Sequence, residues 1–248
     1  MSRRRRSPEG GPASTERWRP TRGLIEAARG ATVPDVIGPR LNVLFVGINP
    51  GLYSGAVGHH FARPGNRFWA ALHGSGFTDR LLSPFEERAL LDRGLGITNL
   101  VERATARADE LGPDELRAGA RRLHSKACRV RPTFVAFLGI SAYRVAFALP
   151  RSRIGPQPTE LCGATVWVLP NPSGLNAHYQ RDDLAEAFAE LRRAVGSERT
   201  GIRARARSTP PRGRPLPAPA DHGSRPGAGR PGVSRSATAR RDGRRSGS

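Results

Sequence analysis

The chain has 248 residues, a net charge of +20 and 37% hydrophobic residues. This length is sufficient for one ordinary domain with tails, or for two small domains. Such an excess of positive charge predicts a polyanionic partner, either nucleic acid or an anionic membrane. Because no apolar run approaches the roughly 18 residues that a membrane span needs, we favour nucleic acid.

The positive charge is concentrated in the outer parts of the chain. Residues 197–248 carry 13 Arg against 3 acidic residues, and residues 1–40 carry 9 Arg against 4. The C-terminal stretch has too few large apolar side chains to offset the entropy cost of ordering. We therefore predict a basic, disordered extension over residues 1–32, a folded domain over 33–196 and a disordered Arg/Pro/Gly/Ser-rich tail over 197–248. The tail is either a tether for DNA phosphates or a solvated extension without a dedicated role.

The two cysteines, Cys128 and Cys162, lie far apart in the sequence and form no CxxC pair. This spacing argues against a disulfide framework, an iron–sulfur cluster and a zinc ribbon. We expect two free thiols, as is usual in a reducing cytoplasm. The N-terminal arginines are followed by no apolar stretch, so the sequence predicts no secretory signal.

Strand and helix patterns alternate through the middle of the chain. Short apolar runs predict four buried strands, which are Leu41–Gly47, Gly96–Leu100, Thr133–Gly139 and Ala164–Leu169. Helical patterns cover Asn66–Leu72, Pro84–Leu91, Asp114–Lys126, Ala142–Ala148 and Arg181–Val195. In the last of these, an apolar stripe predicts packing on a sheet. The alternation favours an α/β fold with helices on both faces of a parallel sheet.

Two of the predicted strands end in loops that place an asparagine directly before a proline. The first strand continues into Gly47–Leu52 (GINPGL), and the fourth into Pro170–Asn176 (PNPSGLN). The residue before proline is pushed into an extended conformation, and ligands bind beyond the carboxyl ends of strands in open parallel sheets. Asn-Pro loops are also ordinary turns, but two of them at one sheet make a binding site the better interpretation.

The segment His59–Trp69 mixes aromatic and basic residues. The ring of Phe61 is suited to stacking on a base, and the arginines are suited to phosphates. Phe68 and Trp69 more simply begin a core helix. The paired histidines have no third ligand at metal spacing, so we predict no metal site here. The chain also lacks GxGxxG, GxxxxGK[ST] and GxSxG motifs, which argues against dinucleotide, P-loop and serine-hydrolase sites.

Together these motifs resemble those of the mismatch-specific uracil-DNA glycosylases, the bacterial relatives of thymine-DNA glycosylase. The resemblance runs from about Val33 to Val195 and rests on four segments: Gly47–Leu52, Phe61 with Pro64–Trp69, Leu100–Thr105 and Asn171–Leu175. It implies a three-layer α/β/α fold with a short, parallel, four-stranded central sheet. It also implies a monofunctional enzyme of base excision repair that removes uracil, especially opposite guanine, and often etheno-cytosine, with thymine as a further candidate, and that needs no metal or cofactor.

The same resemblance assigns roles to residues. Asn49 positions the attacking water, and Asn171 lies beside the base and sugar as a second catalytic residue. Phe61 stacks on the flipped base, in a pocket that also includes Gly47, Ile48, Ser54 and Asn66. The residues implied to contact DNA are Ser173, Gly174, Leu175 and Asn176, with Leu175 as the wedge that fills the gap in the duplex. The implied partner is double-stranded DNA with uracil or a mismatched pyrimidine opposite guanine, bound by a monomer in the bacterial cytoplasm, at the nucleoid and away from membranes.

Two positions differ from the bacterial pattern. Tyr53 stands where a small residue is common, and no arginine lies two places past Leu175. Since Asn49 has no carboxylate, it can orient water but cannot act as a general base, which predicts a slow enzyme. Two alternatives stay open: a non-catalytic basic DNA-binding module, and an enzyme that acts on free nucleosides. The first leaves the two asparagine loops unexplained, and the second leaves Leu175 and the basic flanks unexplained.

Overall fold

The computed structural model describes residues 19–174 and 179–208. A five-stranded sheet with the order β2-β1-β3-β5-β4 forms the centre of this part of the chain. Its strands are β1 (Val43–Gly47), β2 (Leu95–Asn99), β3 (Phe134–Leu138), β4 (Gly155–Leu161) and β5 (Ala164–Leu169). β1 pairs in parallel with β2 and β3, and β3 pairs in parallel with β5. These four strands are the four that the sequence predicts.

The expected strand count needs one correction, because β4 adds an antiparallel strand beside β5. The sequence of β4 holds Pro156 and Pro158, and most of its middle is exposed. Proline cannot donate a ladder hydrogen bond and is therefore confined to edge strands and irregular positions. The pairing accordingly shifts its register between Pro156 and Glu160. A strand of this kind carries no apolar run that marks it in the sequence.

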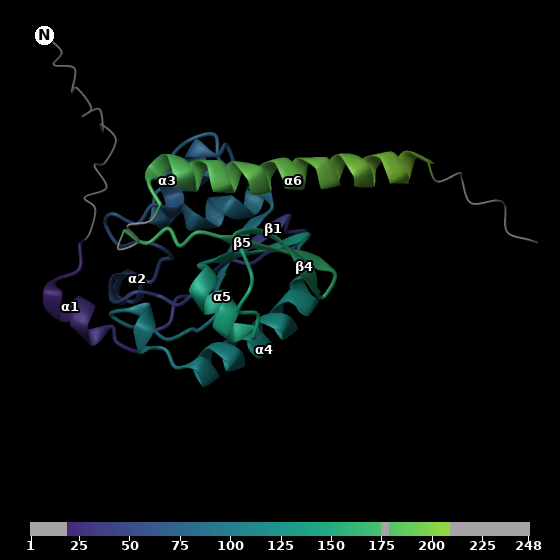
Figure 1. The fold of residues 1–248 in the computed structure, drawn as a ribbon. Helices are drawn as coiled ribbons and strands as arrows, with labels where there is room; N and C mark the ends of the chain where they lie inside the picture. The colour runs from purple at the N-terminus through teal and green to yellow at the C-terminus, as the bar shows by residue number, and fades with distance from the viewer. Residues whose placement is uncertain (1–18, 175–178, 209–248) are drawn as a thin grey trace, which may run out of the picture. The chain divides into compact units, whose positions relative to one another are not determined.

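Helices cover both faces of the sheet, as Figure 1 shows. One face packs against α3 (Phe68–Gly74), the 3₁₀ helix η1 (Pro84–Arg93) and α6 (Arg181–Ser208), and the other against α4 (Pro113–Val130) and α5 (Ile140–Ala146). Alternate residues of a strand point to opposite faces, so Val43 and Phe45 belong to the first core while Leu44 and Val46 belong to the second. The three-layer arrangement is thus confirmed. The remaining helices are α1 (Arg22–Ala27), α2 (Leu52–Val57) and the 3₁₀ helix η2 (Ala108–Glu110).

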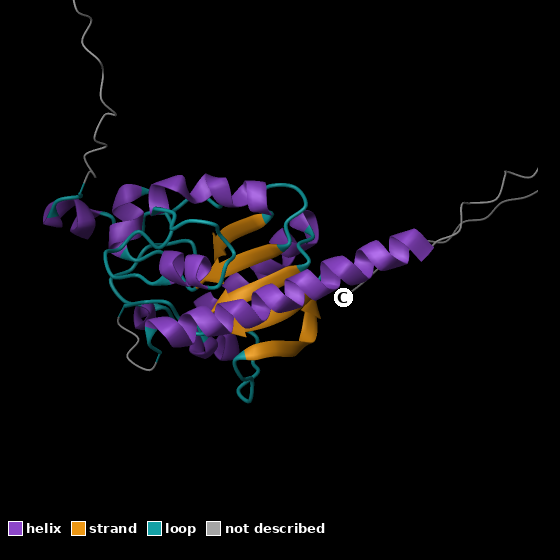
Figure 2. Ribbon diagram, turned by 90° about the horizontal axis from the view of Figure 1, so that it is seen from above, coloured by secondary structure: helices purple, strands orange, loops and turns teal. Residues whose placement is uncertain are grey.

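The stripe predicted for the last helix is buried against the sheet. Leu184, Phe188 and Leu191 are fully buried, and the ring of Phe188 stacks on that of Phe45 with 5.8 Å between centroids. Figure 2 shows α6 lying across the strands. The helix begins at Arg181, as predicted, but continues past 196 to Ser208.

The N-terminal boundary also differs from the prediction. Helix α1 and the buried Ala28 precede residue 33. The backbone of this stretch joins the domain, because the N–H of Gly30 donates to the carbonyl of Ala104 and the N–H of Ala104 donates to the carbonyl of Ala31. Residues 19–32 therefore belong to the folded part of the chain rather than to an extension.

The expectation of two free thiols is wrong. Cys128 in the last turn of α4 forms a disulfide with Cys162 in the turn between β4 and β5, with 5.1 Å between their Cα atoms. That separation lies within the usual range for disulfides. The sequence shows only the distance along the chain, whereas the packing of α4 beside the β4–β5 hairpin brings the residues together.

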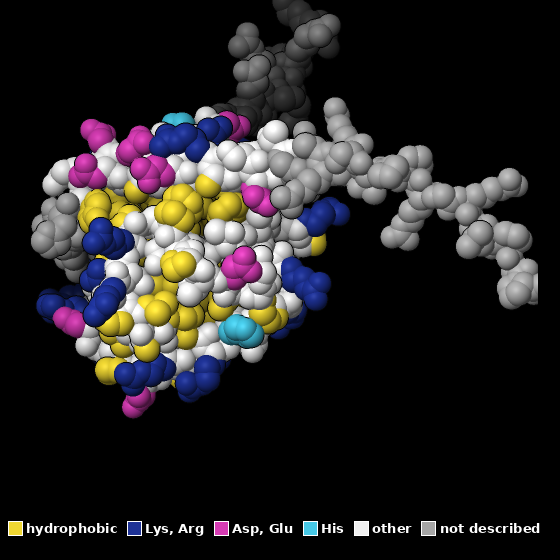
Figure 3. All heavy atoms as spheres, turned by 45° about the vertical axis from the view of Figure 1, so that its right-hand side comes forward, with side chains coloured by type: hydrophobic (Ala, Val, Ile, Leu, Met, Phe, Trp, Pro, Cys, Tyr) yellow, Lys and Arg dark blue, Asp and Glu magenta, His cyan; other side chains and the backbone are white. Residues whose placement is uncertain are grey.

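Charge is mixed on the surface of the domain. On the face drawn in Figure 3, Lys and Arg side chains lie mainly around the border, with acidic side chains among them and apolar ones nearer the centre. Among the described residues, no helix is long and apolar enough to cross a membrane. Most of the excess positive charge of the chain lies in residues 1–40 and 197–248.

Candidate active site

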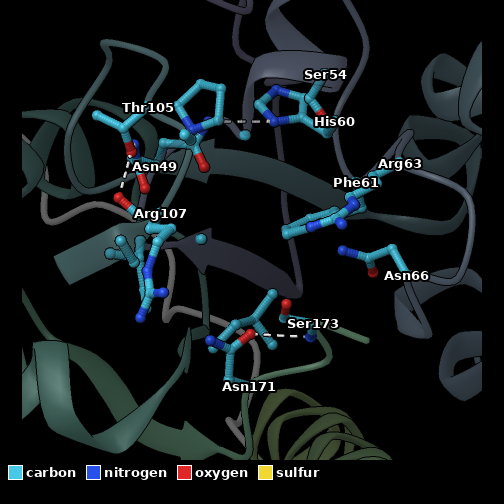
Figure 4. Close-up of a pocket in the computed structure, with 18 residues that line it drawn as sticks. Asn49, Ser54, His60, Phe61, Arg63, Asn66, Thr105, Arg107, Asn171 and Ser173 are labelled. Atoms are coloured by element: carbon cyan, nitrogen blue, oxygen red, sulfur yellow. Dashed lines mark hydrogen bonds between the residues drawn. The ribbon is translucent and has the colours of Figure 1, made fainter. Parts of the chain in front are cut away.

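A cavity of about 130 Å³ opens where β1, β2 and β3 end and beside the loop that follows β5 (Figure 4). Its volume suits one small ring and is well below the roughly 300 Å³ of pockets for larger ligands. Among the residues that line it are all those that the sequence assigns to catalysis or base binding, and one assigned to DNA: Gly47, Ile48, Asn49, Ser54, Phe61, Asn66, Asn171 and Ser173. The two asparagine loops thus meet at one cavity.

Asn49 is held in one orientation by the loop that follows β2. Its Nδ2 donates to the carbonyl of Arg103 at 3.0 Å and to Oγ1 of Thr105 at 2.7 Å. These bonds use both amide hydrogens, so Oδ1 is the atom left to accept a hydrogen bond from a water. Backbone bonds between Leu52 and Thr105 and between Thr105 and Pro50, each 3.1 Å, fix the two loops to each other.

Gly47 allows two side chains to approach the backbone at the bottom of the cavity. A Cβ atom on this residue would lie 2.4 Å from Oδ1 of Asn99 and 3.3 Å from Cζ of Phe61. The first distance is shorter than any van der Waals contact permits. Glycine at the end of β1 is therefore a condition for this pocket, and Asn99, the last residue of β2, forms part of its wall.

The orientation of the Asn99 amide follows from the tautomer of His60. Nε2 of His60 lies 2.9 Å from the carbonyl of Pro34, which can only accept, so Nε2 carries the hydrogen. Burial lowers the pKa of His60 below its ordinary value, against the opposing effect of Glu87, so the ring is neutral near pH 7. Nδ1 then accepts from Nδ2 of Asn99 at 3.4 Å, which leaves Oδ1 of Asn99 as an acceptor.

Both of the adjacent histidines contact the carboxylate of Glu87. One carboxylate oxygen of the buried Glu87 accepts from the backbone N–H of His60, and the other lies 2.8 Å from Nδ1 of His59. This network anchors the segment that leads into Phe61.

Phe61 adopts a backbone conformation that few large residues take. Its φ angle is 53°, in the left-handed region, and such residues cost about 1–3 kcal/mol and occur often at functional sites. Its ring packs on Phe68 with 4.1 Å between centroids. The hydroxyl of Ser54 accepts from the N–H of Ala62 at 3.0 Å, so Ser54 fixes the loop next to the ring. Ser54 thus lines the cavity and also holds the backbone beside Phe61 in place.

The second asparagine loop is stabilised by its own side chain and by the segment Pro64–Trp69. Oδ1 of Asn171 accepts from the N–H of Ser173 at 3.0 Å, which forms an Asx turn (Figure 4). A Cβ on Gly174 would lie 2.7 Å from the carbonyl oxygen of Gly65, so the backbone of this loop touches the backbone at Gly65. Gly174 is exposed beyond this contact.

Arg67 connects the segment Pro64–Trp69 to both ends of the loop that carries the proposed wedge. Its backbone N–H donates to Pro172 at 3.0 Å, and its guanidinium donates to the carbonyls of Ser173, at 2.6 Å, and Tyr179. Leu175 and Asn176 lie outside the described residues.

The cavity also includes residues for which the sequence predicts no individual role in base binding or catalysis. Asn99, His60 and Thr105 contribute to its wall, and the exposed Arg63 and Arg107 lie at its rim. Asn99 closes a strand whose apolar pattern is weak, and His60 was considered only as a metal ligand. The signal that finds Asn99 is its place at the carboxyl end of a strand adjacent to β1. Oδ1 of Asn66 accepts from the N–H of Phe68, the first residue of α3, and the amide nitrogen turns toward the cavity (Figure 4).

A family model, the uracil DNA glycosylase superfamily, matches residues 34–192, which is more than half of the chain. The chain belongs to this superfamily. It therefore has a DNA glycosylase domain, which hydrolyses N-glycosyl bonds in DNA. Among solved structures, the chain is similar to a protein from Methanosarcina acetivorans assigned to the uracil DNA glycosylases, with 18% identity and a TM-score of 0.43 over 66% of this chain and 97% of that one.

Proposed function

We propose that this glycosylase removes uracil, and related damaged pyrimidines, opposite guanine in double-stranded DNA. It flips the nucleotide out of the duplex and hydrolyses its bond to the sugar with water. The observation that carries this proposal is the orientation of Asn49, whose amide hydrogens are both engaged while its oxygen remains to hold a water beside a cavity of one-ring size.

The chemistry follows from the neutral groups at the site. As the bond breaks, the sugar gains oxocarbenium character and the base leaves as a delocalised anion. Asn49 cannot remove a full proton, so it contributes by placing the water, and proximity supplies much of the rate. The amide of Asn171 lies on another loop of the same cavity and is suited to stabilising the leaving base.

The amide of Asn99 accounts for the choice of base. Its Oδ1 is an acceptor because its nitrogen donates to His60. Uracil and thymine present an N3–H donor, whereas cytosine presents an acceptor at the same position. A flipped uracil stacked on Phe61 would therefore be bound and an intact cytosine repelled, since an unmatched buried polar pair costs about 1–3 kcal/mol.

Preference for a mismatch follows from the cost of flipping. A mispaired base is extruded more easily than a paired one. On this proposal Leu175 fills the vacated space and Gly174 approaches the unpaired guanine with its backbone. The contact between Gly174 and Gly65 ties that loop to the base pocket.

The decisive experiment is single-turnover excision on duplexes of identical flanking sequence that place uracil or thymine opposite guanine or adenine, followed by alkaline cleavage of abasic sites. We expect the fastest excision for uracil opposite guanine and none from free deoxyuridine. A non-catalytic DNA-binding module would bind the duplexes without creating alkali-labile sites. An enzyme for free nucleosides would release uracil from deoxyuridine, and either result would contradict the proposal.

A further inference from the structure

Two cysteines and a histidine meet at the end of α4. His124 and Cys128 lie one turn apart on that helix and therefore on one face. Cys162 occupies the turn between β4 and β5, where its φ of 52° directs the chain back toward the helix. The sulfurs of Cys128 and Cys162 are paired in the disulfide described above.

The imidazole of His124 lies beside both sulfurs. Its Nδ1 is 3.7 Å from Sγ of Cys128 and its Nε2 is 3.6 Å from Sγ of Cys162. One potential ligand atom from each of the three residues lies within 4.8 Å of the other two. His124 is exposed and the cysteines are half-buried, so an ion in solution can reach the group.

This group lies at the opposite end of the parallel strands from the catalytic cavity. Cys128 comes shortly before β3 begins at Phe134, and Cys162 shortly before β5 begins at Ala164. Because β3 and β5 are parallel, both cysteines lie at the amino ends of the strands. The cavity is at the carboxyl ends, so the group takes no part in the reaction described above.

We propose that His124, Cys128 and Cys162 form a binding site for Zn²⁺ or another thiophilic cation when the two cysteines are reduced. Thiolate and imidazole ligands suit such ions, and three protein ligands leave a fourth tetrahedral position for water. A protein that repairs DNA works where cellular thiols keep disulfides reduced. A cellular dithiol supplies the two electrons and two protons that convert the disulfide to thiols and is itself oxidised to a disulfide.

Metal binding and disulfide formation use the same two sulfurs. On binding, each thiol releases one proton and the thiolates form bonds to the cation, without any change in oxidation state. Either state links α4 to the β4–β5 hairpin. The cation therefore replaces the covalent link in the reduced protein and should raise its unfolding temperature.

The test uses the full chain, reduced with a dithiol and then kept free of oxygen, with Co²⁺ as a spectroscopic probe. We expect one Co²⁺ per chain, a thiolate-to-metal charge-transfer band, displacement by Zn²⁺, and protection of both thiols from an aromatic disulfide reagent. Cys128→Ser or Cys162→Ser should greatly weaken the band. His124→Ala should lower the affinity at least about tenfold, while His73→Ala, at another exposed histidine, should leave it unchanged.

Any of three results would overturn the proposal: no charge-transfer band from the reduced chain, a band of full strength in Cys128→Ser, or a disulfide that cannot be reduced without unfolding the domain. Single-turnover excision by His124→Ala should equal that of the parent, which separates this site from the catalytic one.

Discussion

Of the two glycines that line the cavity, Gly47 and Gly51, only Gly47 has no room for a side chain. Because a Cβ here would overlap Oδ1 of Asn99, Gly47→Ala should displace the pocket wall. A displacement near 1 Å costs about a hundredfold in rate, so we expect single-turnover excision to fall by that order. Gly112→Ala, where the added Cβ meets no heavy atom within 4 Å, is the matched control. Parental excision by Gly47→Ala would mean that Asn99 and Phe61 do not shape the base pocket.

Asn49 carries the largest share of the proposed chemistry. Asn49→Ala removes the group that orients the water, and we expect a loss of at least about a hundredfold in single-turnover rate, with binding of uracil-containing DNA retained. Asn42→Ala is the control, because the Asn42 amide also donates to a carbonyl, that of Arg93, but at the start of β1. If Asn49→Ala excises uracil as fast as the parent, Asn171 becomes the leading candidate.

His60 should make the protein sensitive to mild acid. Its pKa is lowered by burial, so the unfolded chain binds the proton more tightly than the folded one. Its contribution to stability is therefore present above the ordinary histidine pKa of about 6.5 and is lost as the pH falls through the lower pKa of the folded state. Protonation would also place an N–H against the amide nitrogen of Asn99. We expect both the free energy of unfolding and the excision rate to decline below about pH 6.5.

The pH experiment compares the parent with His60→Gln, which does not titrate. In urea unfolding from pH 7.5 to 5, the difference in unfolding free energy between the two should be constant at the upper end and shrink toward the lower end. The same comparison for His73→Gln accounts for the loss of one histidine at an exposed site. A difference that stays constant over the whole range would contradict the assignment.

At the scale of elements, Arg67 connects α3 to the loop after β5. Its guanidinium bonds to Ser173 and Tyr179 should hold that loop against the segment Pro64–Trp69. A hydrogen bond from a charged group contributes about 1.5–3 kcal/mol, so Arg67→Lys, which loses the forked geometry, should weaken binding of uracil-containing duplex about tenfold or more. The salt dependence of binding separates this role from a phosphate contact. A positioning residue leaves the slope unchanged, whereas loss of a phosphate contact reduces it by about one unit.

The elements that the sequence predicts are those with a regular apolar pattern. The four parallel strands could be located because strands buried on both faces are continuous apolar runs, and α6 because its buried side is an apolar stripe with helical spacing. β4 could not, since its two prolines and exposed middle resemble a loop. In the site, proline marks Asn49 and Asn171, whereas nothing beside Asn99 in the sequence shows that His60 orients it from 39 residues away. The disulfide could not be predicted either, since Cys128 and Cys162 are 34 residues apart and meet only in the folded chain.

At the scale of the whole molecule, the basic tail should act on affinity rather than on catalysis. The structure moves the end of α6 to Ser208, so the deletion that tests the tail removes residues 209–248, which carry nine Arg and two Asp. We expect nearly unchanged single-turnover excision on a short duplex at low salt, weaker binding, and a shallower dependence of log affinity on log salt. An unchanged slope would show that these arginines do not contact phosphates.

The cavity is assembled from four separate parts of the chain, namely residues 47–66, residues 99–108, Leu138 and residues 171–173, and helix α6, which covers one face of the sheet, comes after them. During translation, a ribosome adding about 5–20 residues per second releases the asparagine of the first loop long before that of the second. A nascent or prematurely terminated chain that stops before residue 171 therefore contains Asn49 but no complete pocket. We therefore expect an enzyme that leaves abasic sites in DNA to stay inactive until almost its whole domain has been synthesised.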